Sequence, residues 1–183
     1  MSSGPSVTRF LVVALALAPA ALRGQRLEYL GGGAGLVAPS GSFVDVEKAG
    51  WHVSALGIGR VKASLHFVID ALYGRTTHQG GVAGHSTLAG GTVNAALFLV
   101  GDRRAVRPFV MAGAGFFRVN VDVPGFGSVA ATKLAPAAGV GVLLGTARRR
   151  GFLMARYVSV GTSPQTTRFI PVSAGVMFPV GIH

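Results

Sequence analysis

The sequence predicts an all-β protein, an eight-stranded antiparallel up-and-down barrel whose strands cross a membrane. Apolar residues recur with a period of two along the chain and mark eight candidate strands, although the first two are too rich in glycine for their faces to be assigned. Hydrophobic residues make up 50% of the chain and charged residues only 13%, whereas an average soluble domain is about a quarter charged. Glycine, at 28 of 183 residues, has about twice its usual share. Such a chain is short of the charge that a water-soluble surface needs.

Residues 1–24 have the pattern of an export signal peptide. Arg9 precedes the apolar stretch "FLVVALALAPAAL", and small residues follow it. This stretch is too short for a membrane-spanning helix, which needs about 20 residues. We expect cleavage after Gly24, with Ala20 as the alternative, so that residues 25–183 form the barrel domain.

The expected strands are 27–38, 50–59, 62–74, 86–100, 107–122, 132–145, 151–160 and 168–178. Most are longer than the five or six residues usual in soluble sheets, and they match the 9–11 residues of a tilted membrane-crossing strand. The connections alternate between long segments such as "RTTHQGGVAGH" and short ones such as "GDRRAV". Outer-membrane barrels have this asymmetry, with short turns in the periplasm and long loops outside. Both termini are therefore expected in the periplasm.

Alternation assigns faces to most strands. In 62–74, Phe67 and Ile69 share the predicted lipid face, and His66 and Asp70 the inner face. In 86–100, Val93 and Leu97 are expected outside. In 107–122 we expect the lipid face to carry Phe109, Met111, Phe117, Val119 and Val121, which directs Arg118 and Asp122 inward. In 151–160, Arg156 falls on the inner face.

The inner charges are the first candidate site. They are His66, Asp70, Arg118, Asp122, Lys133 and Arg156. An eight-stranded barrel is only wide enough for side chains to fill it, and unpaired buried ions are costly. We therefore expect a charge network that blocks the bore, with an open pore as the alternative.

The segment "RPFVMAGAGFFRVNVD…TKLAPAAGVGVLLGTARRRGFLMARY…TTRFIPVSAGVMF" resembles the C-terminal half of small bacterial outer-membrane β-barrel proteins of the OmpA/OmpX/OmpW type. The similarity spans residues 27–178. It implies outer-membrane lipids, lipopolysaccharide and the outer-membrane assembly machinery as partners. In this family the last strand resembles the signal read by that machinery, which here would comprise Val172, Ala174, Val176 and Phe178. The chain departs from the pattern because "PVGIH" follows the aromatic.

Other functional classes find little support. The chain has a net charge of +11, but its basic residues cluster where turns are expected, which disfavours nucleic-acid binding. Its glycine stretches lack the helix of a dinucleotide fingerprint. His78 and His85 flank a loop without a third metal ligand. His85 directly precedes Ser86, so the two would face opposite sides of a strand rather than form a catalytic pair. We expect no cofactor.

These patterns predict a monomeric outer-membrane protein with a structural or interaction role, or at most narrow passage of small solutes. Two alternatives stay open. A soluble periplasmic or secreted barrel holding an apolar ligand would also alternate. A lipid-modifying outer-membrane enzyme would share the fold.

Overall fold

The computed structural model describes residues 26–80, 84–123, 125, 127–146, 149–161 and 166–180, and these form one closed barrel. Each strand pairs antiparallel with its neighbours in sequence, and β8 closes the sheet on β1. The strands are β1 (Arg26–Ser40), β2 (Glu47–Arg60), β3 (Leu65–His78), β4 (His85–Phe98), β5 (Val106–Val123), β6 (Gly127–Thr146), β7 (Arg149–Val160) and β8 (Thr167–Pro179). The predicted fold is confirmed. The predicted signal peptide lies outside the described residues.

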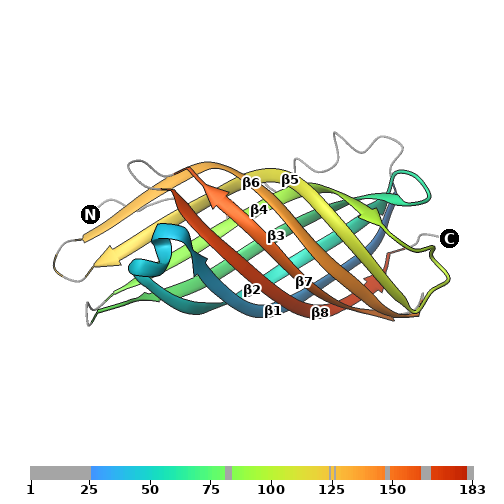
Figure 1. The fold of residues 1–183 in the computed structure, drawn as a ribbon, viewed down its shortest axis with the longest axis horizontal. Coiled ribbons are helices and arrows are strands. Elements are labelled where there is room, and N and C mark those ends of the chain that lie inside the picture. The colour runs from blue at the N-terminus through green and yellow to red at the C-terminus, as the bar shows by residue number, and fades with distance from the viewer. Residues whose placement is uncertain are drawn as a thin grey trace.

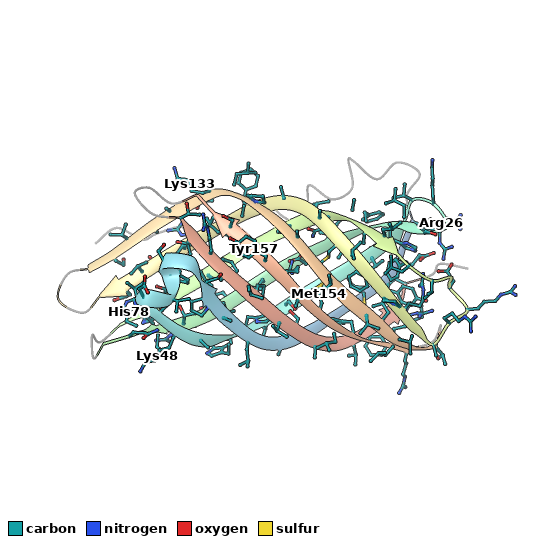
Figure 2. All side chains as sticks on the ribbon, viewed as in Figure 1. Arg26, Lys48, His78, Lys133, Met154 and Tyr157 are labelled. Atoms are coloured by element: carbon teal, nitrogen blue, oxygen red, sulfur yellow. The ribbon has the colours of Figure 1, made fainter. Side chains whose placement is uncertain are left out.

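The barrel is elongated, with tilted strands and connections at two opposite ends (Figure 1). At one end, here called the turn end, lie the β2–β3, β4–β5 and β6–β7 turns, the start of β1 and the end of β8. At the other, the loop end, a 3-10 helix η1 (Gly41–Asp45) joins β1 to β2. Arg26 lies at the turn end, and Lys48 and His78 lie at the loop end (Figure 2). No helix in the described residues is long and apolar enough to cross a membrane.

The β5–β6 hairpin extends past its neighbours at the loop end (Figure 1). β6 pairs with β5 from Gly127 onward, but its register with β7 covers only Ala137–Thr146. On this extension, Val129 is 74% exposed.

The lumen is filled by buried side chains in layers. The apolar layer toward the turn end contains Leu56, Ile58, Val68, Ala96, Phe98, Phe109, Met111, Leu143, Phe152, Met154 and Met177. The apolar layer toward the loop end contains Val37, Leu72, Leu88, Phe117, Val119, Ala135, Ala137, Val158, Val160 and Phe169. Inward glycines make room for rings: a Cβ at Gly141 would lie 2.4 Å from the Phe109 ring. Large side chains can therefore fill a narrow barrel.

The outer face is apolar around most of the barrel. Exposed residues on it include Leu36, Val93, Leu97, Val110, Val140, Leu153, Val172 and Val176. This agrees with the alternation read from β4, β7 and β8. On β3, Tyr73 is 38% exposed, but Phe67, which was expected on the lipid face, is only 7% exposed because its ring packs over Gly59.

The predicted faces of β5 are wrong. Phe109, Met111, Phe117 and Val119 are buried in the lumen, whereas Phe116 is 63% exposed. Both faces of β5 carry large apolar residues, so alternation alone did not distinguish them. The polar residues that suggested an inner face lie near the loop end, where an outward side chain meets solvent.

Candidate functional site

The centre of the lumen holds a buried ion pair between the two apolar layers. Arg156 Nη1 binds Asp70 Oδ2, and neither side chain is accessible to solvent. Thr92 Oγ1 donates to the same carboxylate oxygen, and Asn94 Nδ2 donates to Thr92 Oγ1 at 2.7 Å. β3, β4 and β7 therefore contribute side chains to one polar layer across the bore.

The other four predicted lumen charges do not join this pair. Arg118 is exposed on the outer face, because its neighbours Phe117 and Val119 point inward. Asp122 shares the outward parity of Arg118. Lys133 shares the inward parity of Ala135 but is exposed, since it precedes the part of β6 that pairs with β7.

His66, the fourth, is buried near the turn end. Its Nε2 lies 3.6 Å from Glu28 Oε2, and its ring packs edge-on against Phe98.

A second polar cluster lies inside the loop end. Buried Glu47 Oε1 accepts from Ser86 Oγ at 2.5 Å and lies 2.6 Å from His78 Nδ1. His78 Nε2 donates to the Asp122 carbonyl at 3.2 Å. The hydroxyl of Ser86 is thus bound to Glu47 rather than to a histidine, and His85 lies on the opposite face of β4. No group of three or more possible metal ligands occurs in the described residues.

The turn end is held by a larger network. Arg60 binds Glu28 Oε1 and Asp102 Oδ2, each at 2.6 Å, and Asp102 also binds Arg107. The Arg107 guanidinium stacks 4.4 Å from the centre of the Phe98 ring. These contacts tie the turn before β5 to β1, β2 and β5.

Electrostatics keep the Asp102 carboxylate ionised. Burial alone would raise its pKa, but the hydrogen bond from Arg60 and the positive charges of Arg107 and Arg60 lower the pKa below its ordinary value. The network therefore has a charged acceptor at neutral pH.

Sequence reasoning missed this network because it placed the basic clusters in solvated turns. Arg103 and Arg104 are exposed, as expected, but Arg107 and Arg150 are only 2% and 3% exposed. The position of these residues in their strands could have indicated their burial. Each is the second residue of its strand, where a side chain can point into the end of the barrel.

The predicted assembly segment forms the outer face of β8. Val172, Val176 and Phe178 are 41–56% exposed, and Ala174 is exposed between them. Phe178 pairs with Leu30 of β1, where the sheet closes.

The solved structures that resemble this chain are small membrane barrels. Neisserial surface protein A (NspA) superposes with a TM-score of 0.65 at 20% identity, covering 85% of this chain and 99% of that chain. The N-terminal β-barrel domain of Pseudomonas aeruginosa OprF gives a TM-score of 0.52 at 12% identity, covering 84% and 96%. The fold is that of the small eight-stranded outer-membrane barrels.

A third similar structure is Ail, the attachment invasion locus protein of Yersinia pestis, in complex with the heparin analogue sucrose octasulfate. It gives a TM-score of 0.51 at 16% identity and covers 84% of this chain and 98% of that chain. No family model and no curated protein sequence matches the chain.

Proposed function

We propose that this protein spans the bacterial outer membrane as a closed barrel and acts as a structural or interaction protein. The observation that carries the proposal is an inversion of the usual burial pattern. The Asp70–Arg156 ion pair is inaccessible in the lumen, while residues such as Leu36 and Val93 are 64% and 58% exposed on the outside. A surrounding membrane explains the exposed apolar side chains and the inward charges, because hydrocarbon accepts apolar side chains and excludes charged ones.

The closed lumen supports a role through surfaces rather than through transport. Two apolar layers occupy the bore, and between them lies the polar layer built around the Asp70–Arg156 pair, here called the Asp70 layer. The connections and the extended β5–β6 hairpin at the loop end are then the parts available to partners. A monomer is sufficient, because closure of β8 on β1 leaves the barrel itself without an unpaired seam.

The rival soluble barrel needs space for an apolar ligand. The packed side chains of the two apolar layers occupy the place where such a ligand would bind. The exposed apolar outer face would also favour aggregation in water, since soluble monomers rarely expose contiguous apolar patches of more than a few hundred Å².

Fractionation followed by electrophoresis tests the membrane assignment. We expect the protein in the outer-membrane fraction, and we expect unboiled samples in detergent to migrate as a compact species that boiling converts to the unfolded one. Closed pairing of all backbone groups gives barrels this resistance. Recovery in the soluble fraction without detergent would contradict the proposal.

Residues 1–24 are proposed as the cleaved export signal, with the turn end in the periplasm. N-terminal sequencing of the mature protein tests the cleavage. Surface labelling of a cysteine introduced at Val129, compared with one at Lys62, tests the orientation: both residues are exposed and they lie at opposite ends. Labelling of intact cells at Lys62 alone would mean the reverse orientation.

We also propose that the outer face of β8 is read during assembly. Phe178→Ala should lower the amount of inserted barrel, and removal of residues 181–183 should do much less. The matched control is Phe116→Ala, which removes an exposed ring from β5. Quantitative blotting of the outer-membrane fraction measures both. Equal losses for the two alanine variants would contradict a specific role for β8.

A further inference from the structure

Positive charge gathers at the turn end of the barrel. The described turn-end cations are Arg26, Arg60, Lys62, Arg103, Arg104, Arg107, Arg149 and Arg150. Among the described residues of this end, only Glu28 and Asp102 carry carboxylates. The loop end is closer to balance, with Lys48, Arg75, Arg118, Lys133 and Arg168 against Asp45, Glu47 and Asp122. The turn end therefore has most of the unneutralised charge of the described chain.

Part of this charge lines a cavity of about 350 Å³ that is open to solvent. Its walls are turn residues 102–105 on one side, and Gly145, Thr146 and Arg150 on the other. The Gly145 amide donates to the Ala105 carbonyl at 2.8 Å and joins the two walls. Gly145 has a φ of +107°, and a Cβ there would lie 2.7 Å from the Arg149 carbonyl oxygen. Glycine is therefore required where the two turns meet.

Arg150 is one of the residues that line this cavity, and one of its buried nitrogens has no partner among the described residues. Its Nε donates to the Tyr29 hydroxyl and its Nη2 to the Asp102 carbonyl, both at 3.2 Å. Nη1 is buried and has no hydrogen-bond acceptor among the described residues. A buried guanidinium N–H without an acceptor is destabilising, so a small shift of the side chain that brings this N–H to an anion in the cavity would form a charge-assisted hydrogen bond.

The carboxylate in the wall does not neutralise this site. Asp102 directs its two oxygens to Arg60 and Arg107. Arg103 and Arg104 are exposed and line the cavity, so their guanidinium groups are accessible to a bound group. The local balance of charge thus favours an anion.

We propose that the turn-end cavity binds a phosphate group, held by Arg150 from within and by Arg103 and Arg104 from outside. Planar guanidinium groups match the oxygens of phosphate, and the cavity leaves room for the ester that carries it. The phosphate belongs either to an anionic phospholipid headgroup of the facing leaflet or to a soluble phosphate ester. The lipid source rests on the proposed membrane location; phosphate binding does not.

Calorimetry of the full chain in zwitterionic detergent tests the site with glycerol phosphate and inorganic phosphate. A second arm places the chain in phosphatidylcholine nanodiscs with increasing phosphatidylglycerol, and native mass spectrometry counts the retained anionic lipid. The test variant is Arg103→Gln/Arg104→Gln. The control is Arg118→Gln/Lys133→Gln, which removes the same charge from exposed loop-end positions.

We expect saturable binding of one phosphate group per chain, weakened about ten-fold in the test variant and less than about two-fold in the control. Arg150→Lys should also weaken binding, because lysine lacks the planar fork. Its folding is checked by migration without boiling. Binding in the nanodisc arm alone identifies a lipid headgroup, and binding in both arms a phosphate site of wider specificity.

Equal weakening of the test and control variants, or no saturable binding in either arm, would overturn the site. If the protein binds glycerol phosphate but is recovered in the soluble fraction, the phosphate site is supported and the proposed membrane location is contradicted. The two proposals therefore fail separately.

Discussion

Arg156 and Arg118 have the same charge and were expected on the same inner face, but their surroundings differ. Arg156 is buried against Asp70, and Arg118 is exposed outside the barrel. A guanidinium that bulk solvent does not reach depends on its carboxylate partner, whereas a guanidinium at the surface is hydrated. The two residues therefore make a matched pair of substitutions.

Arg156→Met should destabilise the folded barrel by about 3–5 kcal/mol, because it leaves the Asp70 carboxylate buried without its partner. Arg118→Met should change stability by less than about 0.5 kcal/mol. The double variant Asp70→Asn/Arg156→Met should recover part of the loss, since no unpaired charge then stays in the lumen. Urea unfolding from lipid vesicles measures all three. Equal effects of the two single variants would mean that Arg156 is solvated.

Asp102 predicts a pH dependence at the turn end. Its pKa in the folded protein is lowered, so its stabilising contribution is present above its unfolded pKa and is lost as the pH falls through the folded value. Between pH 7 and pH values below about 4, the native protein should lose more unfolding free energy than Asp102→Asn. Unfolding curves at both pH values measure the difference. Parallel losses would show that Asp102 is not coupled to Arg60 and Arg107 in solution.

β5 shows what sets the face of a strand in this barrel. Phe116 and Phe117 are adjacent in sequence, yet Phe116 is 63% exposed and Phe117 is inaccessible. A Cβ at Gly90 of β4 would lie 2.7 Å from the Phe117 ring, so the glycine on the neighbouring strand creates the space for the inner ring. The position of glycines across the sheet, more than the hydropathy of β5, distinguishes the two faces.

Phe117→Ala should cost about 3–5 kcal/mol of unfolding free energy, since it opens a cavity among Leu88, Val119 and Phe169. Phe116→Ala removes the same atoms from the outer face and should cost less than half as much. The comparison uses urea unfolding from vesicles, with retained migration of the unboiled protein as the check on folding. A larger loss for Phe116→Ala would restore the face assignment made from the sequence.

Strand number, strand order and most faces followed from the sequence because period-two alternation is a local property. The pairing of side chains inside the lumen did not follow from the sequence. Asp70 and Arg156 lie on β3 and β7, and their meeting depends on barrel closure and on the register of every strand between them. The buried positions of Arg107 and Arg150 were missed for a related reason, since a turn-end side chain can point outward to water or inward across the mouth.

Together, the layers of side chains fill the lumen along the length of the barrel. From the turn end to the loop end, a charged network is followed by an apolar layer, the Asp70 layer, a second apolar layer and the Glu47 cluster. An ion moving along the axis would have to pass both apolar layers. Loss of one polar contact would leave these layers in place.

The native protein should therefore show no large, stable conductance in planar bilayers. Arg156→Met should show none either, because the apolar layers on both sides stay closed. Insertion is verified in the same preparation by migration without boiling. A stable open channel in the native protein would show that the lumen rearranges in the membrane.

Because β8 pairs with β1, the barrel can close only after its last strand has been synthesised. Ala34 pairs with Ala174, so the first strand to be synthesised gains its second neighbour only when the last strand arrives. Gly31, Gly33 and Gly35 let the two backbones come close: a Cβ at each would lie 1.8–2.3 Å from a carbonyl oxygen of β8. Contacts this distant in sequence are slow to form, because the intervening chain must be ordered first. Until β8 docks, a nascent chain exposes an unpaired edge on β1, and the interval before docking is when proteases and chaperones can compete for it.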